Sequence, residues 1–192
     1  MSTVAATNLK NASSATNNIV LNADGTTTIT SPSNMIKSGT AQASTSGTAI
    51  DFTGLPSLVK RVTVIFNGVS TNGGSNLRVQ VGAGSITSSG YVGAAANVQN
   101  ANATNGTAYP GGGFDLINNG STQILHGSVR IQNISGNIWV VDGVLSVSGV
   151  ANGADMTGGT VTLAGVLDRV RITTVNGTDT FDAGTINILY EG

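Results

Sequence analysis

The sequence predicts an all-β fold: an antiparallel, jelly-roll-like β-sandwich of about seven or eight strands, preceded by an extended N-terminal arm. Charged residues make up only 9% of the 192 residues, and Glu occurs once, as Glu191. Long solvated helices rely on many Glu–Lys pairs, so this composition disfavours them. Val, Ile and Thr, which favour strands, recur instead in alternating stretches that Gly- and Asn-containing turns separate.

Residues 1–45 are expected to form the N-terminal arm. The short apolar run Ile19–Leu21 is followed by an Asp-Gly pair and then by a second extended run, 26–29. Two extended runs around an Asp-Gly turn predict a hairpin. An isolated hairpin is only marginally stable in water, so the arm needs a partner surface, either on its own domain or on another copy of the chain. The polar stretch 37–48 is expected to be a linker.

Residues 46–192 are expected to form the sandwich. Side chains alternate between the two faces of a strand, so the apolar positions of each run identify its core face. The residues expected to face inward are Val62, Val64, Phe66, Leu77, Val79 and Val81, while Arg78 and Gln80 are expected to face outward. Further strands are expected at 123–132, 138–149, 160–165, 168–175 and 185–191.

The stretch 91–113 and the final strand of this domain are expected to contribute differently to the core. Residues 91–113 are rich in Ala, Asn and Gly and are expected to be a long loop or an edge. The final strand instead places Ile186, Ile188 and Tyr190 on one face. The end of the chain is therefore expected to belong to the core.

Composition and charge argue against several classes of partner. The formal net charge of −1 leaves no concentrated basic face for nucleic acid. No apolar run approaches the roughly 20 residues of a membrane span, and no polybasic patch favours anionic lipid, so no membrane insertion is expected. The N-terminus lacks the features of a secretory signal, and the chain has no cysteine. Synthesis in a cytoplasm is therefore expected.

No catalytic constellation stands out, so the chain is not expected to be an enzyme. His126 is the only histidine, and no serine or acid is marked as its partner in a triad. One histidine without cysteine also argues against a zinc site. We therefore expect no cofactor and no metal centre, with His126 facing solvent or an interface.

Paired carboxylates are the strongest enzymatic alternative, because glycoside hydrolysis uses two. Asp179 and Asp182 are close in sequence, and Asp155 and Asp168 are a second pair that folding can bring together. A calcium ion held by Asp179, Asp182 and Asn176 is the remaining metal alternative. Aspartates in such a Gly-containing turn more often accept hydrogen bonds from nearby backbone N–H groups, and that interpretation is favoured.

Gly- and Asn-rich loops on the rigid sandwich are the predicted ligand surface, because binding residues concentrate on such loops. The loops expected to be exposed are 71–76 and 97–113. Aromatic rings beside amides suit a carbohydrate, since rings stack on C–H edges and amides bind hydroxyls. The candidate ligand-binding residues are Asn72, Asn76, Tyr91, Asn102 and Tyr109. Trp139, the only tryptophan, is expected in the core or between subunits.

Two stretches resemble a module found in tail-fibre and related virion proteins of tailed bacteriophages. They read "TSGTAIDFTGLPSLVKRVTVIFNGVSTNGGSNLRVQVG" and "LAGVLDRVRITTVNGTDTFDAGTINILYEG". The resemblance covers about residues 46–192. The arm sequence "NLKNASSATNNIVLNADGTTTI" looks like the segments that precede or link β modules in such proteins.

The resemblance implies a virion surface protein, made in the bacterial host and usually a homotrimer. Residues 1–45 would attach it to another virion protein of the tail, baseplate or capsid, and the sandwich would bind a host cell-surface glycan or receptor. We therefore expect a short tail fibre or fibre tip. Two alternatives stay open: a capsid decoration or cement protein that forms knobs on the head, and a glycan hydrolase that acts through Asp179 or Asp182.

Overall fold

The computed structural model describes residues 8–9, 12–13, 19–29, 36–99, 104–108, 111–118, 120–149 and 153–192. These residues form strands, turns and loops and contain no helix, which confirms the predicted all-β fold. The chain divides into two compact units, Met1–Met35 and Ile36–Gly192.

The N-terminal unit contains a three-stranded antiparallel sheet of β1 (Asn8–Leu9), β2 (Ile19–Leu21) and β3 (Thr27–Ile29). Strands β2 and β3 form the predicted hairpin. Its turn is closed because the Asp24 carboxylate accepts hydrogen bonds from the backbone N–H and the hydroxyl of Thr26, at 2.9 and 2.6 Å. Gly25 has a φ of 82°, in the left-handed region that glycine adopts without strain.

The hairpin leaves apolar side chains uncovered. Leu21 is 50% exposed, and Ile19 and Val20 are only half-buried. Isolated strands of this length are not stable without further packing. A partner surface for this segment stays a prediction.

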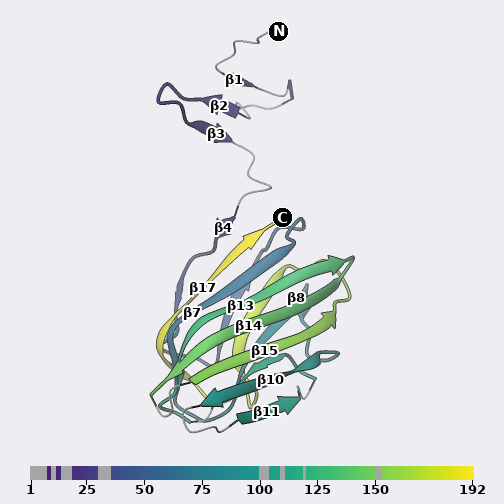
Figure 1. Ribbon diagram of the computed structural model, residues 1–192. Coiled ribbons are helices and arrows are strands. Elements are labelled where there is room, and N and C mark those ends of the chain that lie inside the picture. Colours follow the sequence, from purple (N-terminus) through teal and green to yellow (C-terminus); the bar gives the residue numbers. More distant parts are fainter. Residues whose placement is uncertain are drawn as a thin grey trace. The chain divides into compact units, whose positions relative to one another are not determined.

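The C-terminal unit is a sandwich of two antiparallel sheets (Figure 1). The larger sheet has the order β11-β10-β15-β14-β13-β7-β17-β4, with β5 also pairing with β17, and the smaller has the order β12-β8-β16-β6, with β9 pairing with β8. The larger sheet comprises β4 (Lys37–Ser38), β5 (Gln42–Ala43), β7 (Arg61–Thr71), β10 (Val92–Gln99), β11 (Thr104–Ala108), β13 (Ile124–Ser135), β14 (Ile138–Ser148), β15 (Gly153–Thr162) and β17 (Phe181–Glu191). The smaller comprises β6 (Ala49–Thr53), β8 (Leu77–Ala83), β9 (Ser85–Ile86), β12 (Phe114–Leu116) and β16 (Arg169–Thr174).

The core lies between the two sheets, and the alternation in the sequence identifies its residues. All six residues expected to face inward, on β7 and β8, are 2% exposed or less. Val170 and Ile172 add the same pattern on β16, each fully buried. Period-two alternation therefore predicts the core faces of the central strands correctly.

The last strand belongs to the core, as expected. β17 pairs with β7 from Phe181 to Glu191 and with β4 and β5 on its other edge. Phe181, Ile186 and Ile188 are 2% exposed or less, and Tyr190 packs against the core from a partly buried position. The C-terminal residues are thus held on both edges of the strand and on its inner face.

The stretch 37–48 is not a free linker. β4 and β5 pair with β17, and the Ser44 hydroxyl, which is fully buried, donates to the Ala183 carbonyl at 2.8 Å. The two units therefore divide at residue 35, and not near residue 45. β4 and β5 contain no β-branched residue, so strand propensity does not reveal this pairing.

The stretch 91–113 is not one long loop. β10 pairs with β15 over eight residues, and β11 pairs with β10. The two sheets consequently hold more strands than the seven or eight predicted. The other expectation for this stretch, an edge of the sandwich, is met by β11, which ends the larger sheet, whereas the pairing of β10 with β15 was not expected.

Candidate functional site: a polar hollow on the smaller sheet

The outward face of the smaller sheet carries polar side chains in register. Every second residue of β6, β16 and β8 faces away from the core. Strand pairing produces two rows: Asp51, Arg171 and Gln80 in one, and Ala49, Thr173 and Arg78 in the next. β12 extends the second row, because Asp115 pairs with Arg78.

Asp51 holds Arg171 in place. Nε and Nη2 of Arg171 donate to the two carboxylate oxygens of Asp51, each at 2.7 Å. This hydrogen bonding raises the pKa of Arg171, so its guanidinium stays charged. The two side chains are 37% and 41% exposed, so the pair fixes geometry more than it contributes to stability.

Asp115 holds Arg78 in the same bidentate way, but this pair is buried. Nε and Nη2 of Arg78 donate to the Asp115 carboxylate at 2.7 and 3.2 Å. The two side chains are only 11% and 1% exposed. Burial raises the pKa of Asp115, and its hydrogen bond and charge interaction with Arg78 oppose that rise. The buried carboxylate therefore depends on Arg78 for compensation of its charge.

A glycine segment covers Arg78 and Gln80, which were expected to face solvent. A Cβ on Gly113 would lie 2.5 Å from Cγ of Arg78, and one on Gly112 would lie 2.7 Å from its Nη1. The Gln80 side-chain amide donates to the Gly112 carbonyl at 2.7 Å. Only glycine lets the backbone pass this closely, and the two polar side chains are consequently 9% exposed each.

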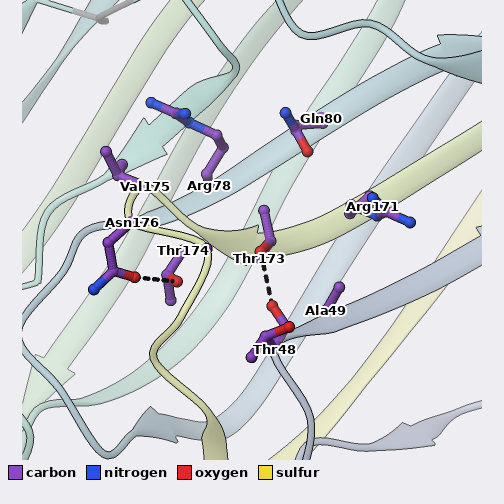
Figure 2. Close-up of a pocket in the computed structure, with 10 residues that line it drawn as sticks. Thr48, Ala49, Arg78, Gln80, Arg171, Thr173, Thr174, Val175 and Asn176 are labelled. Atoms are coloured by element: carbon purple, nitrogen blue, oxygen red, sulfur yellow. Dashed lines mark hydrogen bonds between the residues drawn. The ribbon is translucent and has the colours of Figure 1, made fainter.

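These rows border a polar hollow of about 320 Å³ (Figure 2). Its lining comprises Thr48, Ala49, Arg78, Gln80, Arg171, Thr173, Thr174, Val175, Asn176 and Gly177. The Thr173 hydroxyl donates to the Thr48 carbonyl at 2.7 Å, and the Thr174 hydroxyl donates to Oδ1 of Asn176 at 2.9 Å. The volume is at the lower end of the roughly 300–1,000 Å³ of ligand pockets.

The hollow can recognise a ligand by hydrogen bonds. Its lining presents guanidinium, amide and hydroxyl groups, and the carboxylates bound to Arg171 and Arg78 balance their charges. Among the described residues, the lining includes no aromatic ring, acid or histidine. What the arrangement offers is a rigid set of donors and acceptors.

A network of amide hydrogen bonds holds the loops beside the hollow. Oδ1 of Asn72 accepts from the Thr180 N–H, and Oδ1 of Asn76 accepts from the Asn118 N–H, each at 2.9 Å. Asp179 accepts from the Ser75 N–H at 3.0 Å. Asn72 and Asn76, two of the predicted ligand-binding residues, therefore fasten neighbouring loops to each other.

Tyr91 is not part of a ligand surface, and its prediction as a binding residue is wrong. It is 4% exposed, and its ring packs edge-on against Phe114 with centroids 4.8 Å apart. Its hydroxyl oxygen accepts from the Val81 N–H at 2.9 Å and lies 3.2 and 3.0 Å from the carbonyls of Val81 and Thr87. Burial raises the pKa of Tyr91 to about 12.

Of three further residues in the predicted loop 97–113, one lies in the core and two lie outside the described residues. Asn97, at the start of the predicted loop 97–113, lies in β10 and is fully buried. Asn102 and Tyr109 lie outside the described residues. Of the two loops expected to be exposed, 71–76 retains exposed positions, including Asn72.

His126 and Trp139 occupy the positions expected of strand residues. His126 is exposed on β13, where its Nδ1 accepts from the Gly68 N–H at 3.1 Å. Trp139 is 3% exposed on β14, which confirms a place in the core.

The carboxylates proposed as pairs bind different partners. Asp179 bonds to Ser75 and Asn176 as a turn residue, whereas Asp182 accepts from the Ser70 hydroxyl. Asp168 bonds to Arg169 and the Gly84 N–H, while Asp155 accepts from the side chain of Asn97 on β10. Among the described residues, no three His, Asp or Glu side chains gather as metal ligands. The same residues contain no helix with the length and hydropathy needed to cross a membrane.

The sequence did not predict the hollow, because none of its residues belongs to a recognisable motif. Arg78, Gln80, Arg171 and Thr173 are outward positions of strands that lie far apart in the sequence. The sequence does show polar residues at alternate positions of β8 and of β16. Knowledge of which strands are neighbours is needed to see that these positions meet.

Asp155 gives the sandwich a predicted pH dependence. Its carboxylate is fully buried, one oxygen has no hydrogen-bond partner, and burial raises its pKa from 3.8 to about 6. The folded state therefore binds the proton more tightly than the unfolded chain, so this stabilisation is complete below about pH 4 and is lost as the pH rises through about 6. We expect Asp155→Asn to be more stable than the parent at pH 8 by about 1–3 kcal/mol.

Denaturant unfolding of both proteins at pH 8 and pH 4.5 checks this expectation. The gain should shrink at the lower pH, because the parent carboxyl is then protonated. Asp142, whose side chain is 45% exposed and paired with Arg130, supplies the matched control as Asp142→Asn. A loss of stability at pH 8 in Asp155→Asn would contradict the account.

Comparison of the chain with protein-family models, with curated proteins and with solved structures found no match. Support for a function therefore comes from two sources. One is the resemblance in the sequence, and the other is the geometry of the two units and the hollow.

Proposed function

We propose that the chain is a structural protein of a tailed-bacteriophage virion, a short tail fibre or fibre tip. In this proposal the N-terminal unit attaches it to another virion protein, and the β-sandwich binds the host cell surface, either a glycan or a protein receptor. The protein is carried on the virion and acts as a homotrimer. The resemblance of residues 46–192 to tail-fibre modules supports the proposal.

The observation that carries the proposal is the division of the chain into two unlike units. Residues 36–192 form a sandwich with a continuous core between its sheets, whereas residues 1–35 contain a small sheet with uncovered apolar side chains. Burying Leu21 against another chain would offset the marginal stability of such a sheet. That need supports attachment by this segment to a virion protein and to its own copies.

The hollow supports the host-binding part of the proposal. The outward face of the smaller sheet holds its polar groups in fixed positions through bidentate ion pairs, and sites built on strands are held more precisely than sites on loops. The geometry offers hydrogen-bond recognition, which agrees with attachment more than with hydrolysis.

An adsorption-competition experiment tests this function. Host cells are incubated with the purified full-length chain, the corresponding phage is added, and unadsorbed particles are counted. We expect adsorption to fall with increasing protein, because the sandwich occupies the same surface sites. The heat-unfolded chain serves as the control and should have no effect.

The alternative functions predict other outcomes. A capsid decoration protein would leave adsorption unchanged at saturating protein and would bind heads that lack it. Shortening of host polysaccharide by the purified chain, lost in Asp179→Asn or Asp182→Asn, would indicate a hydrolase. Either result would overturn the tail-fibre proposal.

A further inference from the structure

We infer that the hollow on the smaller sheet binds a neutral saccharide, as one terminal sugar residue of a longer glycan. This inference deepens the proposed host attachment and rests on it for the source of the glycan. The recognition chemistry is read from the hollow itself.

The first argument is charge. Arg78 and Arg171 each form a bidentate pair with one carboxylate, Asp115 and Asp51. The two positive charges at the hollow are therefore matched by two negative ones. Each guanidinium already has a carboxylate as its partner, so the hollow holds no uncompensated positive charge for an anion and favours a ligand without net charge.

The second argument is hydrogen-bonding capacity. Asp51 uses two of the five N–H groups that an arginine carries, which leaves Arg171 further donors for a ligand. The Gln80 side chain donates to the Gly112 carbonyl and keeps an amide oxygen as an acceptor, and the Thr173 hydroxyl keeps its lone pairs while it donates to Thr48. Neighbouring donors and acceptors match the vicinal hydroxyls of a sugar, each of which donates and accepts.

The third argument is rigidity. The side chains that border the hollow are held by ion pairs, by the covering glycine segment and by the hydrogen bonds of the adjoining loops. Ordering long side chains on binding usually lowers affinity because conformational entropy is lost. Here the side chains are already ordered in the folded protein, so less entropy is lost when a ligand binds. Weakly hydrated, flexible arginines on an open surface would lack this advantage.

Size and the absence of aromatic rings limit the ligand. A hollow of about 320 Å³ suits a small ligand or the end of a chain. In the part of the chain that the structure describes, no aromatic side chain lines the hollow on which a sugar ring could stack. The sugar is therefore held through its hydroxyl groups, and analogues that lack one of them should bind more weakly.

A glycan-binding experiment on the full-length chain tests the inference. The probes are immobilised oligosaccharides of glucose, galactose, mannose, rhamnose and N-acetylglucosamine, beside oligomers of galacturonic and glucuronic acid. We expect binding to at least one neutral probe, no preference for the acidic ones, and affinity that changes less than twofold between 50 and 500 mM NaCl. Binding to none of the neutral probes, or salt-sensitive binding to the acidic ones alone, would overturn the inference.

Matched variants locate the binding. Arg171→Ala and Gln80→Met should each weaken binding to the neutral probe at least tenfold, because each removes groups that border the hollow. Arg130→Ala breaks a more exposed Arg–Asp pair on the outer face of the larger sheet and should leave binding within twofold of the parent. Equal binding by all four proteins would place the saccharide elsewhere. Circular dichroism and melting curves confirm that the variants are folded.

The outcomes separate this inference from the proposed function. If the parent chain blocks phage adsorption but Arg171→Ala and Gln80→Met block it equally well, attachment stands and the hollow is not its site. If the chain binds the neutral probe through the hollow but is absent from virions, the saccharide site stands and the proposed function fails.

Discussion

Deleting Phe181–Gly192 is expected to abolish the cooperative unfolding transition of the sandwich. The deletion removes β17, which pairs along β7 and holds β4 and β5 on its other edge. It also removes Phe181, Ile186 and Ile188 from the core, and burial of each such side chain contributes about 1.5–3 kcal/mol. Their sum is comparable with the roughly 5–15 kcal/mol of total stability that a typical domain has.

Differential scanning calorimetry of the truncated and parent chains makes the comparison. The matched control removes residues 1–35, which form the separate N-terminal unit, and should leave the main transition in place. Retention of a cooperative transition within a few degrees of the parent after loss of β17 would contradict the structure.

Replacing Arg78 by Met is expected to destabilise the sandwich by about 3–5 kcal/mol at pH 7. Methionine keeps the aliphatic stem that packs against Gly113, but it leaves the Asp115 carboxylate buried without its cation. Burial already raises the pKa of Asp115, so loss of Arg78 raises it further. The destabilisation should therefore diminish as the pH falls and the carboxyl takes up a proton.

Denaturant unfolding at pH 7 and pH 4.5 measures the effect. Arg130→Met provides the control, because the Arg130–Asp142 pair is 55% and 45% exposed and should contribute at most about 1 kcal/mol. Equal effects of the two substitutions would show that the Arg78–Asp115 pair is as well solvated as the surface one.

The parts of the fold that the sequence predicted are those set by local pattern. Alternation identifies the inward faces of β7, β8 and β17, because their apolar residues recur at every second position and lie on the core side. The Asp-Gly turn predicts the β2–β3 hairpin, because the side chain of Asp24 and the φ of Gly25 close it locally. Both inferences depend on residues within a few positions of one another.

The features that the sequence did not predict depend on contacts between distant segments. Tyr91 is buried with its ring packed against Phe114, which lies on a separate strand. Arg78 is covered because Gly112 and Gly113 cross above it. Nothing in the local sequence marks either contact, and the hollow depends on the same long-range pairing.

Cryo-electron microscopy of the intact virion tests the proposed function most directly, by tracing this chain in the density. The proposal predicts a sandwich of two sheets at the tail, in three copies around an axis, with residues 1–35 contacting another virion protein. Density for the chain over the head lattice, or its absence from the particle, would contradict it.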